Sequence, residues 1–136
     1  IREGLREEEI EVLDTGAPAA TKPYHSIILV ERETGERTIL DSNAGVLEHT
    51  PESLKESWIA QARGLFLDWL GMDAALQAAK IARERSIPVF LDMESVGDAR
   101  QRELFALTDH LIVPLAFATA YTGATDPERA LRALAP

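Results

Sequence analysis

The chain has 136 residues, a length typical of one domain, and 46% of them are hydrophobic while 27% are charged. It contains no cysteine, which excludes disulfides, thiolate catalysis and cysteine-ligated zinc. The formal net charge of −9 is opposite to the clustered Lys and Arg that nucleic-acid phosphates and anionic membranes require. No apolar run approaches the roughly 18 residues of a membrane span, and the charged start "IREGLREEEIEV" has no signal-peptide core. We therefore expect a cytoplasmic protein without nucleic-acid or membrane partners.

The first third of the sequence predicts a small β structure. Two apolar segments, residues 24–32 and 37–42, enclose the polar tip "RETGE", whose Gly35 can adopt the positive φ that a short hairpin loop needs. A shorter apolar stretch at about residues 10–14 is a candidate for a third strand. Residues 15–23 hold glycine and prolines and are expected to be a loop or an irregular edge.

A helix is predicted over residues 49–62. Thr50 suits the N-cap, Pro51 suits the first helical position, and Glu52 suits the positive end of the helix dipole.

From residue 64 onward, apolar segments of strand length alternate with helical segments. The expected strands are residues 64–70, 87–93 and 110–114, and the expected helices are residues 72–86, 98–109, 115–123 and 125–135. This order predicts right-handed crossovers and a parallel sheet. Continuous apolar runs are typical of strands that are covered on both faces. The predicted fold class is therefore α/β, a Rossmann-like three-layer sheet with a hairpin that forms a separate small sheet or a flap.

Acidic residues follow two of the predicted parallel strands. Asp68 ends the first, and Asp92 with Glu94 ends the second. Ligands of open parallel sheets bind at the carboxyl ends of the strands, where carboxylates can bind sugar hydroxyls or a metal. The alternative is that these residues cap the following helices or simply face solvent.

Two residues of the hairpin region are further candidates for ligand binding. Asn43 follows the second arm, and its amide offers both a donor and an acceptor to a hydroxyl, although Asn is equally a turn former. Arg37 can hold an anionic group, although it can also form an exposed cross-strand pair with a glutamate of the hairpin.

Several motifs are absent from the sequence. His25, His49 and His110 have no spacing typical of zinc ligands, so no metal site is predicted. The chain also has no GxxxxGK[ST], GxGxxG or GxSxG, and no glycine-rich turn is available to hold the phosphates of a nucleotide.

Four segments, taken in order, resemble the ribokinase-type (PfkB) family of carbohydrate kinases. "SIILVERETGERTILDSNAG" resembles the family's lid hairpin and the turn after it, and "AGVLEHTPESL" resembles the approach to the next helix. "GLFLDWLGMDAALQAAKIARERSIPVFLDMES" resembles its strand–helix–strand unit, and "TDHLIVPLAFATAYTGATDPERALRAL" resembles the segment that follows. The resemblance covers nearly the whole chain and is strongest to ketohexokinase-like members.

The resemblance implies a ribokinase-type α/β sheet with a small β lid, and ATP-dependent phosphorylation of a sugar or a related alcohol. It implies that Asn43 helps to hold the sugar, that Arg37 lies near the substrate, and that Asp68 faces the site. It also implies a sugar or sugar-phosphate substrate. Independently of the resemblance, a flap with an apolar face must cover a ligand or pair with a second copy, so a homodimer through the β lid is a further expectation.

Two departures from the family pattern qualify this expectation. Many members have an Asn-x-x-Glu where this chain has Pro114 to Phe117. The family's N-terminal Gly-Gly region and its C-terminal Gly-Ala-Gly-Asp, with the catalytic Asp, have no counterpart here. We therefore expect residues 1–136 to be the central part of a single kinase domain, inactive alone and holding neither the ATP nor the Mg of the complete enzyme. The alternative is a non-catalytic α/β module that binds a small molecule or dimerises.

Overall fold

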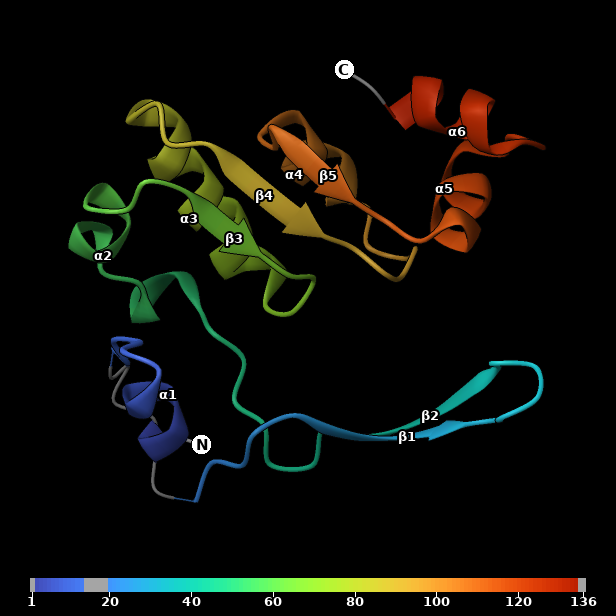
Figure 1. The fold of residues 1–136 in the computed structure, drawn as a ribbon. Coiled ribbons are helices and arrows are strands. Elements are labelled where there is room, and N and C mark those ends of the chain that lie inside the picture. Colours follow the sequence, from blue (N-terminus) through green and yellow to red (C-terminus); the bar gives the residue numbers. More distant parts are fainter. Residues whose placement is uncertain (1, 14–19, 135–136) are drawn as a thin grey trace. The chain divides into compact units, whose positions relative to one another are not determined.

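The computed structural model describes residues 2–13 and 20–134 and forms two compact units, residues 1–48 and 49–136 (Figure 1). The first unit contains α1 (Arg2–Glu7), β1 (His25–Val30) and β2 (Arg37–Ser42). The second unit contains a 3₁₀ helix, five α-helices and three strands. These are η1 (Pro51–Ser53), α2 (Glu56–Ala60), β3 (Leu65–Leu67), α3 (Met72–Glu84), β4 (Val89–Asp92), α4 (Gln101–Ala106), β5 (His110–Ile112), α5 (Leu115–Thr122) and α6 (Pro127–Leu134).

The predicted hairpin is confirmed. β1 and β2 pair antiparallel, with Val30 opposite Arg37 next to the loop. Gly35 adopts a φ of +73°, in the left-handed region that favours glycine, and lets the chain reverse. The two strands form a sheet of their own, as the sequence indicated.

The expected third strand at residues 10–14 is wrong for the part that the structure describes. Residues 10–13 belong to no strand, and residue 14 lies outside the described residues. Ile10 instead donates its backbone N–H to the carbonyl of Leu5 at the end of α1. The short apolar stretch therefore continues from a helix end rather than pairing with the hairpin.

The parallel α/β sheet is confirmed. β4 is the central strand, and both β3 and β5 pair with it in the parallel direction. A helix follows each strand, so each connection crosses over the sheet to return to its starting edge. The three strands consequently end at one edge, which we call the carboxyl edge.

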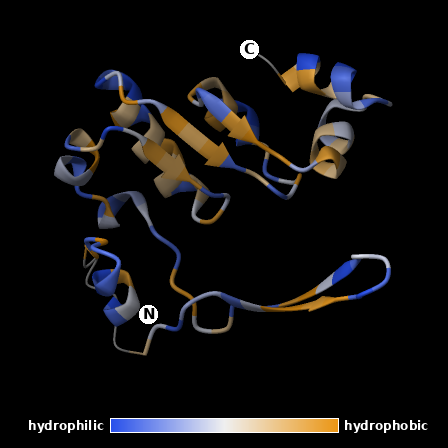
Figure 2. Ribbon diagram, in the orientation of Figure 1, coloured by the Kyte–Doolittle hydropathy of each residue, from blue (hydrophilic) through white to orange (hydrophobic). Residues whose placement is uncertain are grey.

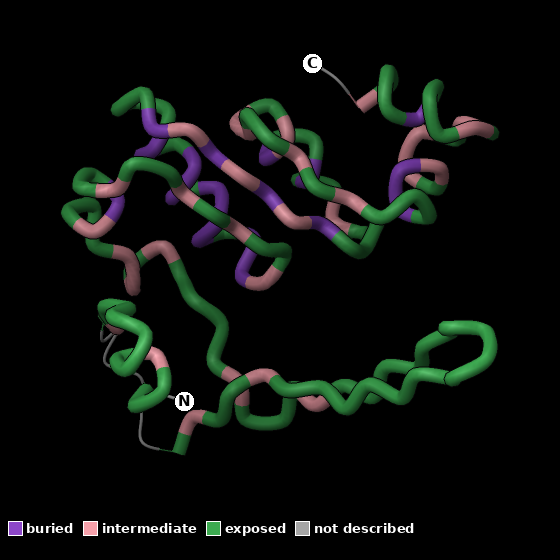
Figure 3. Tube along the Cα trace, in the orientation of Figure 1, coloured by how far each residue is buried: buried purple, intermediate pink, exposed green. Residues whose placement is uncertain are grey.

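The core lies between this sheet and helices α3 and α4 on one of its faces (Figures 1 and 3). α3 contributes the apolar face that the 3.6-residue period predicted, and its Lys80, Arg83 and Glu84 are exposed. The side chains with the least exposure are those of Val89, Leu91, Met93 and Leu104. Alternate residues of β4 therefore carry the centre of the core.

The opposite face of the sheet departs from expectation. Phe66 of β3 is 63% exposed and Ile112 of β5 is 51% exposed, so apolar side chains of this face meet no covering layer among the described residues. Phe90 and His110 stack on each other there with ring centroids 4.5 Å apart. The apolar runs predicted strands covered on both faces, but residues 49–134 supply helices to one face only.

The helix predicted over residues 49–62 is divided. Thr50 is the N-cap and Pro51 the first residue, as predicted, but the 3₁₀ helix ends at Ser53. Leu54 and Lys55 are extended, and α2 begins only at Glu56. Leu54 packs against the core, which explains why the chain leaves the helical path there.

The last two helices follow their end signals. Gly123 ends α5 with a φ of +70°, and the carboxylate of Asp126 accepts a hydrogen bond of 3.0 Å from the backbone N–H of Arg129 at the start of α6. No helix within residues 2–13 and 20–134 is long and apolar enough to cross a membrane.

Gly71, at the start of α3, combines a φ of +66° with a close backbone contact. A Cβ at this position would lie 2.9 Å from the carbonyl oxygen of His49. We expect Gly71→Ala to lower the free energy of unfolding by about 3 kcal/mol, because it adds a backbone collision to the cost of a left-handed residue. Urea denaturation followed by circular dichroism measures this change.

Gly123→Ala is the matched control for this prediction. Gly123 has nearly the same φ, and a Cβ there would meet nothing within 4 Å. It should cost about 1 kcal/mol, the conformational part alone. Equal losses for the two variants would show that the contact with His49 is unimportant.

Candidate functional site

The carboxyl edge brings two of the acidic residues together. Leu67 of β3 lies opposite Leu91 of β4, so Asp68 and Asp92 form the next pair along the two strands. Neighbouring strands are about 4.8 Å apart. Side chains alternate between the faces of a strand, which places Asp92 on the same face as Phe90, opposite the helices, while Asp68 follows the last residue of β3. The strand register therefore places Asp68 and Asp92 at adjacent positions of the carboxyl edge.

Asp68 has a local role in addition. One of its carboxylate oxygens accepts a 3.0 Å hydrogen bond from the backbone N–H of Leu70, which holds the turn that leads to α3. The side chain is exposed, so its second oxygen can still accept a hydrogen bond from a ligand. Both interpretations of Asp68, a turn former and a ligand-binding residue, are compatible with this geometry.

Asp68 also borders a cavity of about 230 Å³. His49 and Leu54 line one side of the cavity, and Ala74 and Ala78 of α3 line another. The volume is below the roughly 300–1,000 Å³ of typical ligand pockets. This part of the chain therefore offers one wall for a small ligand and does not enclose one.

The loop from β4 to α4 leaves the carboxyl edge under tight constraint. The guanidinium of Arg100 donates to both carboxylate oxygens of Asp98, at 3.0 and 2.8 Å, and also to Asp73 in the first turn of α3. The Arg100 side chain, followed by its backbone N–H, lowers the pKa of Asp98 from 3.8 to about 2. Arg100 thereby ties the loop to the helix that precedes β4.

A second constraint comes from Gln101, the first residue of α4. It is 4% exposed, and it is the one buried polar residue in the described part of the chain. Its amide contacts the backbone of Ser95 and Gly97 inside the same loop. Sequence analysis missed this residue, although Gln101 and Leu104 are spaced as an inward helical face.

The hairpin residues Arg37 and Asn43 lie at opposite ends of β2. Arg37 is its first residue and Asn43 follows its last, which separates them by about 20 Å along an extended strand. This distance is longer than a sugar ring, so the structure does not bring the two residues together on one small ligand. Among the described residues Arg37 forms no ion pair, and its cross-strand neighbour is Val30 rather than a glutamate.

Asn43 begins a tight turn that ends at Val46, whose N–H donates to the Asn43 carbonyl at 3.0 Å. Gly45 closes this turn with a φ of +81°. The Asn43 side chain is exposed and makes no hydrogen bond within the described part of the chain. The backbone of Asn43 is therefore the turn former that its residue type suggested, and its amide remains available to a ligand.

The described residues do not fit a metal site of their own. They contain no group of three or more His, Asp or Glu side chains placed to hold an ion.

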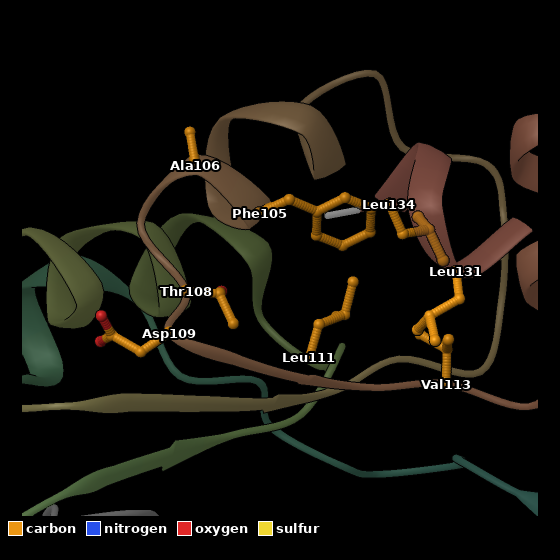
Figure 4. Close-up of a pocket in the computed structure, with 8 residues that line it drawn as sticks. All are labelled: Phe105, Ala106, Thr108, Asp109, Leu111, Val113, Leu131 and Leu134. Carbon is orange, nitrogen blue, oxygen red and sulfur yellow. The ribbon is translucent and has the colours of Figure 1, made fainter. Parts of the chain in front are cut away.

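A second cavity, of about 400 Å³, lies along β5 on the face covered by helices. Figure 4 shows Leu111 extending between Phe105 of α4 and Leu131 of α6. The two polar side chains of its lining are engaged. The hydroxyl of Thr108 donates to the carbonyl of Leu104, and the carboxylate of Asp109 accepts from Arg83 and from the N–H of Val89. We therefore interpret this cavity as an apolar packing groove.

The comparisons with known proteins rest on structure. No family model matches the sequence, and no curated protein matches it. Among solved structures, the chain is similar to the crystal structure of a PfkB protein from Polaromonas sp. JS666, with a TM-score of 0.75 and 15% sequence identity. The match covers 98% of this chain and 51% of that chain. The chain therefore has the PfkB, ribokinase-like α/β fold, and it spans about half the length of the protein it matches.

The ion pair between Asp98 and Arg100 predicts a defined loss of stability in acid. The folded chain holds the pKa of Asp98 near 2, so on acidification the unfolded chain takes up the proton first. The contribution of Asp98 is complete above about pH 4 and is lost as the pH falls to about 2. Asp98→Asn should have a lower urea midpoint than the wild type at pH 7 and a shallower decline between pH 4 and 2.

Glu94→Gln, in the same loop, is the control for this measurement. Glu94 is exposed and forms no ion pair within the described residues. Its decline in acid should match that of the wild type. Parallel curves for Asp98→Asn and the wild type would contradict a stabilising role of the pair.

Proposed function

We propose that this chain is the central part of an ATP-dependent sugar kinase, to which it contributes the lid and part of the sugar pocket. The observation that carries the proposal is the fold match, which takes in 98% of this chain and about half of a PfkB protein. The hairpin and the parallel sheet with its acidic carboxyl edge are both within that match. The substrate is a sugar or a sugar phosphate, because carboxylates and an amide are suited to bind hydroxyl groups.

In this proposal each site residue has a distinct task. Asp68 accepts a hydrogen bond from a sugar hydroxyl with the oxygen that its turn leaves open. Asn43, at the base of the hairpin, donates to one hydroxyl and accepts from another. Arg37, at the other end of β2, acts near the tip of the hairpin and contacts a different part of the bound substrate or an anionic group beside it.

The chemical step depends on groups that these 136 residues do not supply. Phosphoryl transfer needs a base that deprotonates the attacking hydroxyl and donors that neutralise the transferring group. We assign no residue of this chain to either task. ATP and Mg belong to the complete enzyme in this proposal, and residues 1–136 alone have no kinase activity.

The complete parent protein tests this function. Purified parent should phosphorylate a sugar from a broad panel with ATP and Mg, whereas the 136-residue chain should not. Failure of the parent to turn over any sugar would favour the alternative, a non-catalytic binding module.

Asn43→Ala in the parent tests the pocket itself. It should raise the KM for the sugar about tenfold, because a hydrogen bond to a bound hydroxyl is lost, and it should leave the KM for ATP nearly unchanged. Glu33→Gln, in the exposed loop of the same hairpin, is the control and should leave both constants unchanged. An Asn43→Ala enzyme with wild-type sugar dependence would remove Asn43 from the pocket.

We further propose that the hairpin pairs with a second copy of the chain. Two observations support this partner. Each arm of the hairpin has an apolar segment (Figure 2), Ile27 to Val30 in β1 and Ile39 with Leu40 in β2, and these residues are exposed on both faces (Figure 3). Ile27 and Leu29 belong to one face, while Ile28 and Val30 belong to the other.

The two faces differ in polarity. The face of Ile28 also carries Arg37 and Asp41, which suits a ligand, whereas the face of Leu29 carries no charged residue of either strand. Apolar surface of this kind is stable in water only when it is covered. We therefore assign the face of Ile27, Leu29 and Leu40 to the second copy and the opposite face to the ligand.

Sedimentation velocity tests this assignment. The wild-type chain should sediment as a dimer at micromolar concentration, and Leu29→Lys should make it a monomer, because a charge would be buried in an apolar contact. Ile28→Lys, one residue away on the other face, should leave the dimer intact. A wild-type monomer, or equal effects of the two variants, would contradict pairing through this face.

A further inference from the structure

The loop of residues 93–100, between β4 and α4, crosses the carboxyl edge of the sheet. β4 continues its pairing with β5 by one residue, because the N–H of Met93 donates to the carbonyl of Ile112 at 3.0 Å. Burial alternates along this stretch, with Met93 in the core and Glu94 in solvent. The path of the chain after Met93 therefore decides where the polar groups of this loop lie at the edge.

The side chain of Gln101 contacts the backbone of this loop. Its Nε2 group donates to the carbonyl of Ser95 and lies 3.3 Å from the sulfur of Met93. Its Oε1 atom accepts a 3.3 Å hydrogen bond from the N–H of Gly97. One buried carboxamide thus satisfies an acceptor and a donor of the loop backbone at the same time.

This pair of contacts needs an amide. Glutamine has both a donor and an acceptor at the end of its side chain, whereas an ionised glutamate only accepts and leucine does neither. A buried polar group without a partner is costly, so the loop backbone and Gln101 depend on each other. The 4% exposure of Gln101 leaves its own amide little access to water as a substitute partner.

The outer side of the loop is held independently. Arg100 binds Asp98 in the loop and Asp73 on α3, and the backbone N–H of Arg100 donates to Asp98 at 2.8 Å. These contacts lie C-terminal to Gly97 and fix the end of the loop. The backbone of residues 94–97 is held instead by the hydrogen bonds of Gln101. The contact of the Gln101 carboxamide with Ser95 and Gly97 is consequently the one that fixes the backbone conformation nearest to Asp92 and Glu94.

We infer that Gln101 is a positioning residue, which acts through the backbone of Ser95 and Gly97 to hold residues 94–97 in place at the sugar pocket. The inference rests on the proposed function for the identity of that pocket. It assigns no contact between Gln101 and the ligand. Its effect is on the binding of sugar, because the loop lies beside the carboxylates of the carboxyl edge and no reacting group is placed on it.

Hydrogen exchange on the 136-residue chain tests the contact without any activity. Gln101→Leu keeps approximately the size of the side chain but removes both the donor to Ser95 and the acceptor for the N–H of Gly97. We expect the amide of Gly97 to exchange about tenfold faster in this variant, while the amides of α3 keep their wild-type rates. Arg102→Gln, the next residue of α4 and exposed, is the matched control and should change neither set.

Kinetics of the parent protein test the positioning role. Gln101→Leu should raise the KM for sugar about fivefold and change kcat less than twofold, and Arg102→Gln should change neither constant. A wild-type exchange rate at Gly97 in Gln101→Leu would overturn the contact. Faster exchange with an unchanged KM, in a parent whose wild type is active, would overturn the positioning role. A wild-type parent that phosphorylates no sugar would instead overturn the proposed function, and the exchange rates would still decide whether Gln101 holds the loop.

Discussion

The parallel pairing of β4 with both of its neighbours is the constraint on which the second unit depends. It fixes the direction of three strands at once, and each connection must then return across the sheet as a helix. Val89 and Leu91 of β4 are fully buried against these helices, so pairing and core packing support the same arrangement. The common direction also collects the strand ends at one edge, and this is why Asp68 and Asp92 become neighbours although 24 positions separate them in the sequence.

Local patterns were sufficient to predict the architecture. The alternation of apolar runs with helical periods after residue 64 predicted the parallel sheet, and Gly35 between two apolar arms predicted the hairpin. The errors occurred where tertiary contacts decide local structure. Leu54 turns toward the core and interrupts a helix that its neighbours would continue, and residues 10–13 had the composition of a strand but no strand to pair with.

The candidate site was less accessible to sequence reasoning. Asp68 could be chosen because the end of a parallel strand is a defined place, and the register then supplied Asp92 as its neighbour. Arg37 and Asn43 each had a plausible chemistry, but only the length of β2 shows that they are too far apart to share a small ligand. The role of Gln101 depends on burial and on a loop conformation, and neither follows from residue type. The uncovered face of Phe66 and Ile112 could not be predicted either, because continuous apolar runs are typical of strands covered on both faces.

The edge opposite to the strand ends is organised differently. There the carboxylate of Asp109, before β5, joins the guanidinium of Arg83 on α3 to the backbone N–H of Val89 at the start of β4. One acidic side chain thus links α3, the start of β4 and the residue before β5, while at the other edge Asp68 and Glu94 are exposed and Asp92 is half-buried. The two edges of the sheet therefore differ in how strongly their residues are fixed by contacts. Loops at the carboxyl edge can therefore change in sequence with little effect on these contacts, while the interlocked edge preserves the scaffold.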